Sequence, residues 1–202
     1  MPAERGVGVV EPGGGGCRGP GTLSRVNRIP ARVDRADGVV PGSRDAEMPV
    51  EVAVLIGLQA SGKSTFCRTV LADGRAVVSK DDFRNARHRQ VREMRLVGEA
   101  LAAGCSVVVD NTNPSPAQWQ PLIDAAREYG ASVVGYWFPP DPAGSAARNA
   151  ARDDRTRVPD AGLRAVLRDL RRPRRVDGFD QLYTVGFDGA GGFRVEPLDE
   201  EE

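Results

Sequence analysis

The segment from Gly57 to Thr65 constrains the fold more than any other part of this sequence. It reads Gly-Leu-Gln-Ala-Ser-Gly-Lys-Ser-Thr, so four residues separate its two glycines, and Lys63 and a hydroxyl residue follow at once. Glycines at this spacing let the backbone curl until its N–H groups point inward. The apolar run Val50–Ile56 precedes the segment and a helical stretch follows it. We therefore expect a buried strand, a tight loop and a helix in this order.

A loop of this kind binds phosphate groups. Its N–H groups and the positive end of the helix dipole attract phosphate oxygens. Lys63 is expected to reach the β- and γ-phosphates of ATP as a catalytic cation, and Ser64 is expected to ligate Mg²⁺. The predicted nucleotide-binding residues of the loop are Gly57, Gln59, Ala60, Ser61, Gly62, Lys63, Ser64 and Thr65. ATP and Mg²⁺ are therefore the expected ligands.

The sequence beyond the loop alternates between predicted strands and helices. Apolar runs predict further strands over residues 76–79, 106–110, 132–138, 182–187 and 193–195. Helical spacing and breaking residues predict helices over residues 63–72, 81–103, 116–129, 142–152 and 160–172. This alternation predicts the α/β class, as a three-layer P-loop NTPase sandwich with a mainly parallel sheet. A small helical lid is predicted at about 143–175.

Two of these helices carry further local predictions. Ser115 is predicted to cap the helix that begins at Pro116, since serine is a favoured N-cap and proline a favoured first helical residue. In the helix predicted over 81–103, apolar residues recur at helical spacing and are expected to face the core. They are Val91, Met94, Leu96, Val97 and Leu101.

The first 47 residues differ in composition from the rest. They are rich in Gly, Pro and Arg and show no periodic hydrophobicity, so we interpret them as a disordered tail. A second interpretation, which we favour, is an extension absent from the natural protein, because Met48 stands just before the first strand. The P-loop domain is then expected over 48–198, with an acidic tail at 199–202.

Bulk properties exclude several classes of protein. The 28 basic and 28 acidic residues balance, so no overall field attracts nucleic acid or anionic membrane. Three separated cysteines and a single histidine argue against a disulfide scaffold or a zinc site. No apolar run reaches the roughly 18 residues of a membrane span, and no signal peptide is apparent. A cytoplasmic protein without a membrane partner is expected.

A candidate catalytic acid follows the second predicted strand, in Ser79-Lys80-Asp81-Asp82-Phe83-Arg84. In a parallel α/β sheet the ligand lies beyond the carboxyl ends of the strands, so a carboxylate here faces the phosphates. Asp81 could then accept the proton of an attacking hydroxyl group. Alternatively, Asp81 could simply cap the helix predicted to begin here. The two roles are compatible.

A second acid ends the apolar run Val107–Val109. Asp110 fits the Walker B pattern, in which the acid holds Mg²⁺ or orients its water ligands. A strand followed by Asp is frequent in α/β proteins, so the prediction depends on the partnership with the P-loop. Asn111 and Asn113 could position a substrate or simply turn the chain.

Two arginines in the predicted lid are candidate phosphate contacts. Arg148 and Arg152 are four residues apart and therefore lie on one face of a helix. Cations on a lid could meet the negative charge of the transferring γ-phosphoryl group. Alternatively, they could belong to a solvated basic helix.

Taken in order, these motifs resemble the kinase domains of the polynucleotide kinase family, which includes phage and animal 5′-hydroxyl polynucleotide kinases and bacterial RNA-repair kinases. The resemblance covers most of Val50–Val195. Besides the P-loop it rests on Asp81-Asp82-Phe83-Arg84, Asp110-Asn111-Thr112-Asn113-Pro114, and Arg148-Asn149-Ala150-Ala151-Arg152 followed by Val158-Pro159. The sequence contains no D-x-D-x-[TV] phosphatase motif, so the kinase fold is expected to be presented alone.

The resemblance implies a role for each matching residue. Asp81 would be the general base for the acceptor 5′-hydroxyl, and Arg84 would hold the phosphate beside the acceptor nucleoside. Arg152 would stabilise the transferring phosphoryl group, helped by Arg148 on the nucleotide side. The phosphate and acceptor site would be lined by Asp110 and Asn113, with Asp110 also serving the metal.

Three functions remain open. The first is an ATP-dependent kinase for the 5′-hydroxyl of RNA or DNA, which Arg84 and the arginine-rich lid favour. The second is a kinase for a small hydroxyl compound, which needs the same base and the same lid. The third is a nucleotide-dependent switch or ATPase, against which Asp81 beside Arg84 argues, since a switch needs no base for an acceptor.

Overall fold

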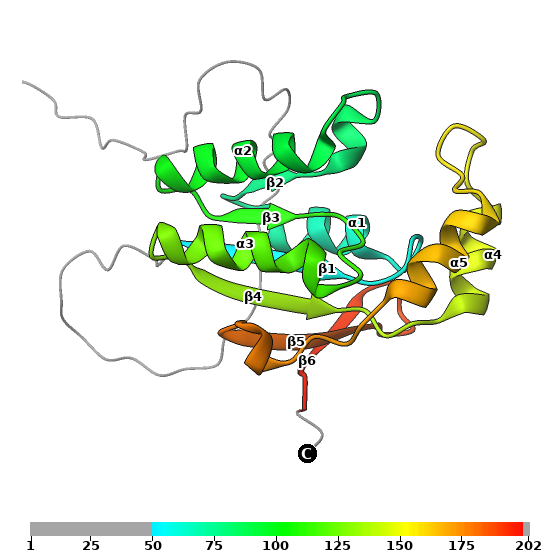
Figure 1. The fold of residues 1–202 in the computed structure, drawn as a ribbon. Helices are drawn as coiled ribbons and strands as arrows, with labels where there is room; N and C mark the ends of the chain where they lie inside the picture. The colour runs from blue at the N-terminus through cyan, green and yellow to red at the C-terminus, as the bar shows by residue number, and fades with distance from the viewer. Residues whose placement is uncertain (1–49, 200–202) are drawn as a thin grey trace, which may run out of the picture.

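A computed structural model describes residues 50–199 and contains one six-stranded sheet (Figure 1). The strand order is β2-β3-β1-β4-β5-β6, and every pair is parallel except β5 with β6. The strands are β1 (Glu51–Ile56), β2 (Ala76–Val78), β3 (Val107–Val109), β4 (Ser132–Trp137), β5 (Gln181–Phe187) and β6 (Phe193–Pro197).

The central strand β1 is apolar because helices cover both of its faces. Val52 to Ile56 are fully buried, as expected for a parallel strand between two layers. One core joins alternate β1 side chains to the helices on one face, through residues such as Val97 and Trp119. The other core holds Ala53 and Leu55 against Phe66 on the opposite face. The molecule is therefore a three-layer α/β sandwich.

The helices occupy these layers unequally. The helices α2 and α3 lie side by side on one face of the sheet, while α1 with its π-helical continuation covers the other (Figure 1). The hairpin of α4 and α5 stands beyond the carboxyl ends of the parallel strands. The α-helices are α1 (Lys63–Phe66), α2 (Arg89–Ala102), α3 (Pro116–Glu128), α4 (Pro142–Ala150) and α5 (Asp160–Asp169), with a π-helix at Cys67–Leu71 and 3₁₀ turns at Lys80–Phe83 and Arg175–Asp177.

The predicted fold class is confirmed: the sheet is mostly parallel and the fold is that of a P-loop NTPase. Predicted strands match the observed ones to within one or two residues, and the last two form an antiparallel pair at the sheet edge. The first 47 residues and the tail beyond 199 lie outside the described residues. Within the described part of the chain, no helix has both the length and the apolar character that a bilayer crossing needs.

The predicted start of the helix over 81–103 was wrong. A short 3₁₀ turn at Lys80–Phe83 comes first, and α2 begins only at Arg89. His88 adopts the left-handed conformation with φ of 56°, which an α-helix interior does not accommodate, so the two elements are separate. The expected core face was also partly wrong, because Val91 is 68% exposed and Glu93 is completely buried.

Smaller differences concern helix ends. Ser115 occupies the N-cap position of α3, but its side chain makes no capping hydrogen bond. The helix α4 ends two residues before the predicted Arg152. The helix α5 ends at Asp169 because Leu170 is extended, ahead of the proline at 173 that also disfavours helical backbone before it.

Candidate active site

The P-loop adopts the tight curve that its glycines predict. Gly62 has φ of 100° and Ala60 has φ of 56°, both in the left-handed region. A Cβ atom at Gly57 would lie 2.8 Å from the Cβ atom of Phe138, so only glycine fits against this residue. The Gly57 N–H donates to the Thr112 carbonyl at 2.9 Å, which ties the loop to the segment after β3.

Lys63 lies buried inside this loop. Its Nζ donates to the Gly57 carbonyl at 3.0 Å, to the Ser61 hydroxyl at 3.2 Å and also to the Leu58 carbonyl. Burial lowers the pKa of Lys63 to about 7, against the favourable fields of Asp110 and Asp81. The charged form of Lys63 is therefore unfavourable in the free loop, and a bound anion such as a phosphate would stabilise it.

Ser64 and Asp110, the two predicted metal ligands, lie close together beside Lys63. Burial raises the pKa of the Asp110 carboxyl above its usual range, and the neighbouring Ser64 hydroxyl and Lys63 ammonium oppose that rise. No group of three or more His, Cys, Asp or Glu side chains suited to a metal ion occurs among residues 50–199. Mg²⁺ in kinases usually has one or two protein ligands, with phosphates and water completing the shell. The hydroxyl and carboxyl pair fits that requirement.

Asp81 lies in the 3₁₀ turn beyond β2, with its carboxylate 74% exposed. The turn is capped by Ser79, whose hydroxyl accepts from the Asp81 N–H at 3.3 Å, so the Asp81 side chain itself is not the cap. Arg84 lies one turn later, with Nη2 3.5 Å from Asp81 Oδ2. The Arg84 Nη1 donates to the Arg155 carbonyl at 3.1 Å and so reaches the α4–α5 hairpin.

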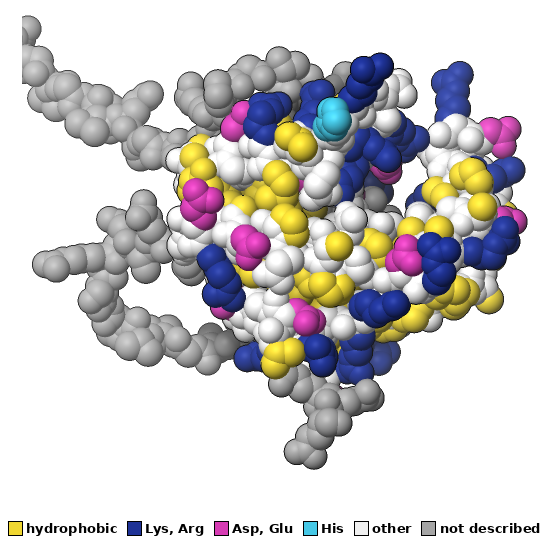
Figure 2. Space-filling view, in the orientation of Figure 1, with side chains coloured by type: hydrophobic (Ala, Val, Ile, Leu, Met, Phe, Trp, Pro, Cys, Tyr) yellow, Lys and Arg dark blue, Asp and Glu magenta, His cyan; other side chains and the backbone are white. Residues whose placement is uncertain are grey.

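The hairpin places both predicted arginines near the loop. Arg148 Nε donates to the Ala60 carbonyl at 2.7 Å. Arg152 lies near enough to Lys63 for its charge to lower the lysine pKa. Buried Asn149 ties α4 to the segment that precedes α5, through hydrogen bonds of 2.7 and 3.0 Å with the backbone of Val158. Figure 2 shows a notch between this hairpin and the body of the molecule, with Lys and Arg side chains gathered beside it.

Asn113 is buried and supports the end of β1 rather than facing the solvent. It is 1% exposed, has φ of 39° and donates from Nδ2 to the Leu55 carbonyl at 2.8 Å. Its Oδ1 atom is buried without a hydrogen-bond partner in the structure. The amide therefore fixes the end of β1, directly before the P-loop, and leaves one acceptor unused.

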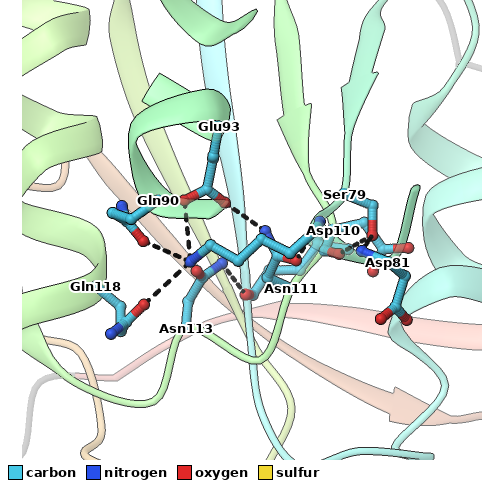
Figure 3. A network of polar contacts seen from close by, with 10 residues as sticks. Ser79, Asp81, Gln90, Glu93, Asp110, Asn111, Asn113 and Gln118 are labelled. Atoms are coloured by element: carbon cyan, nitrogen blue, oxygen red, sulfur yellow. Dashed lines mark hydrogen bonds and ion pairs between the residues drawn. The ribbon is translucent and has the colours of Figure 1, made fainter. Parts of the chain in front are cut away.

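Two groups of residues escaped the sequence predictions. Phe187, at the end of β5, is 51% exposed and would lie 3.0 Å from a Cβ atom at Gly62. The Arg148 guanidinium lies 5.2 Å above its ring, and Phe193 packs against it at 5.5 Å. The other group is a buried polar network around Lys80 and Glu93 (Figure 3). No sequence motif marks an aromatic residue at the end of a strand, such as Phe187, as part of a nucleotide site. Nor did any sequence pattern indicate that Glu93 would be buried.

Similarity to known proteins agrees with this geometry. Over 80 residues, 39% of this chain, the sequence is 34% identical to the bifunctional polynucleotide phosphatase/kinase of Schizosaccharomyces pombe, of which the match spans 19%. The crystal structure of AvrRxo1-ORF1:-ORF2 with ATP shares the fold with a TM-score of 0.56 at 17% identity, covering 75% of this chain and 58% of that one. Kti12 of Chaetomium thermophilum in complex with ADP-AlF3 shares it with a TM-score of 0.53 at 14% identity, covering 68% and 89%.

The family assignment comes from a longer match. Residues 52–174 match the family described as AAA domain, from the central strand through the P-loop and the hairpin. This region is more than half of the 202-residue chain. The chain therefore belongs to this AAA domain family, and it carries a P-loop kinase-like domain.

Proposed function

We propose that this protein is an ATP- and Mg²⁺-dependent kinase that transfers the γ-phosphoryl group to the 5′-hydroxyl of RNA or DNA. The observation that carries the proposal is the exposed Asp81 carboxylate beside Arg84, at the edge of the sheet where the P-loop opens. A nucleotide switch does not need this pair. The partial identity with a polynucleotide phosphatase/kinase supports a nucleic-acid acceptor.

In this proposal the P-loop holds the nucleotide phosphates. Lys63 exchanges its contacts with loop carbonyls for the β- and γ-phosphate oxygens. Bound Mg²⁺, held by Ser64 and Asp110, would neutralise charge on the same phosphates. The nucleobase packs on the exposed ring of Phe187, beside the Arg148 guanidinium.

The transfer step needs a base and a cation. Asp81 accepts the proton of the acceptor hydroxyl while that oxygen attacks the γ-phosphorus, and the bond to the β–γ bridging oxygen breaks to release ADP. Arg152 stabilises the charge on the transferring group, and Arg84 holds the phosphate next to the acceptor nucleoside. Arg84 must leave Asp81 partly free for this, which their 3.5 Å contact allows.

A small hydroxyl compound is the second candidate acceptor. The balanced formal charge favours it, because a strong polynucleotide ligand is normally met by a broad positive field. The same base and cations would serve the same chemistry. Only the residues that contact the rest of the acceptor would differ.

The acceptor can be identified directly. The protein is incubated with γ-labelled ATP, Mg²⁺ and either 5′-hydroxyl RNA, 5′-hydroxyl DNA or a pool of small hydroxyl compounds. We expect label on an oligonucleotide 5′ end, and we expect Arg84→Gln to raise the oligonucleotide KM about tenfold or more, since a charged hydrogen bond is lost. Arg87→Gln, a nearby exposed arginine, is the control. Labelling of a small compound alone would replace the nucleic-acid proposal.

A further inference from the structure

The buried polar network beneath the site forms a closed ring of three residues (Figure 3). The Lys80 backbone N–H donates to Asn111 Oδ1 at 2.9 Å, and the Asn111 Nδ2 donates to Glu93 Oε1. The ring closes where the Lys80 Nζ lies 3.0 Å from Glu93 Oε2. These residues come from the segment after β2, the segment after β3 and the helix α2.

The members of the ring adjoin the two candidate carboxylates. Lys80 precedes Asp81, and Asn111 follows Asp110. A further hydrogen bond of 2.9 Å runs from the Ser79 hydroxyl to the Asp110 carbonyl. Fixing Lys80 against Asn111 therefore fixes the backbone that carries one carboxylate relative to the backbone that carries the other.

The ammonium of Lys80 is fully used within this network. Its Nζ lies 2.6 Å from Gln90 Oε1 and 3.2 Å from Gln118 Oε1, in addition to the contact with Glu93. A lysine ammonium has three N–H donors, and three side-chain oxygens surround this one. The planar guanidinium of arginine offers a different arrangement of donors. The three oxygens thus match the three donors of a lysine ammonium, in a chain with only one other lysine, Lys63.

Burying the Glu93 carboxylate costs free energy. Its side chain is 0% exposed, and burial raises the pKa of its carboxyl while Lys80 opposes that rise. Apolar residues usually stabilise such a position as well as an ion pair does. A buried pair of this kind is therefore better explained by the geometry it imposes than by stability.

We propose that Glu93 and Lys80 are positioning residues that, through Asn111, hold the proposed base Asp81 in register with the metal-binding Asp110. The inference rests on the proposed function. Neither side chain is assigned contact with ATP or with the acceptor. Their effect on the reaction is to keep Asp81 within reach of the acceptor hydroxyl, where a displacement of about 1 Å can cost on the order of a hundredfold in rate.

The test uses Glu93→Gln, which keeps the shape but replaces one carboxylate oxygen by an amide donor. Glu99→Gln, the same change at an exposed residue of α2, is the control. Amide hydrogen exchange is followed in peptides covering 79–84 and 110–113. We expect exchange there to be about five- to tenfold faster in Glu93→Gln, as for the loss of a buried hydrogen bond, and unchanged in Glu99→Gln.

A second variant separates positioning from stability. Lys80→Met with Glu93→Leu removes the ion pair and opens the ring at Glu93, while the backbone N–H of residue 80 can still bond Asn111; the two side chains form an apolar pair, so the fold should remain. We expect kcat to fall about tenfold to a hundredfold in this variant, with the KM for ATP changed less than about threefold. A double variant that keeps the wild-type kcat would overturn the inference, and so would unchanged exchange in Glu93→Gln. If the wild type labels no acceptor, the proposed function fails, and exchange alone decides whether the ring holds the two segments together.

Discussion

Arg148 and Ala60 join the helical hairpin to the P-loop: the arginine Nε donates a 2.7 Å hydrogen bond to the alanine carbonyl. The same guanidinium lies over the exposed ring of Phe187 and pairs with Asp141 at 3.3 Å. The hairpin, the loop and the end of β5 therefore meet at one guanidinium. In the proposed function, the base of a nucleotide bound in the loop packs beside this junction.

Phe187→Ala is expected to weaken ATP binding. Loss of an aromatic packing surface of this kind costs about 0.5–1.5 kcal/mol, which corresponds to a KM for ATP raised about two- to tenfold. Steady-state kinetics with varied ATP measure this, and kcat should change little. Phe187→Tyr keeps the ring and should keep the wild-type KM. An unchanged KM in Phe187→Ala would place the base elsewhere.

Lys63 predicts a proton uptake on nucleotide binding. With a pKa of about 7, most of this lysine is neutral at pH 8 in the free protein, and ATP phosphates favour the charged form. Binding of ATP without Mg²⁺ at pH 8 should therefore take up close to one proton, about 0.9 at most. Calorimetry in two buffers of different ionisation enthalpy measures the uptake. Lys63→Arg stays charged and should show none, and equal heats for the wild type in both buffers would contradict the assignment.

The same lysine links stability to pH. Its folded pKa is lower than its usual value of 10.5, so the unfolded chain binds more protons between about pH 7 and 10.5. The contribution of Lys63 to the free energy of unfolding therefore increases as pH rises through this window. Denaturant titrations of the free protein at pH 7 and pH 9 measure it, with Lys63→Met as the reference that lacks the titrating group.

Lys80→Met should be more destabilising alone than together with Glu93→Leu. The single change leaves a buried carboxylate without its cation and is expected to cost about 3–5 kcal/mol of unfolding free energy. The double change removes both charges and should recover most of that loss. Chemical denaturation of the wild type, Lys80→Met, Glu93→Leu and the double variant gives the coupling energy. Additive losses in the double variant would show that the pair is not coupled.

Much of the fold could be predicted because it depends on local patterns. Buried parallel strands are continuous apolar runs, so β1, β3 and β4 were readable to within one or two residues. The P-loop could be predicted because glycines at this spacing are needed for its tightly curved backbone. Ser64 and Asp110 could be paired because both follow strands that end at the same edge of the sheet.

The rest depends on contacts that no local pattern carries. Periodicity assigned Val91 to the core, whereas α2 turns that residue to solvent and buries Glu93. Glu93 is stable there only because Lys80 and Asn111, from two other segments, meet it. Phe187 becomes part of the site only when β5 pairs with β4 and brings its end beside Gly62.

The most direct test of the account is the transfer rate of Asp81→Asn with γ-labelled ATP and the acceptor that the wild type labels. Loss of a general base should lower kcat on the order of a hundredfold to ten-thousandfold, while the Kd for ATP changes less than about threefold. Asp82→Asn, the adjacent exposed carboxylate, should keep kcat within about twofold. If Asp81→Asn transferred phosphate at the wild-type rate, Asp81 would not be the base and the proposed mechanism would be wrong.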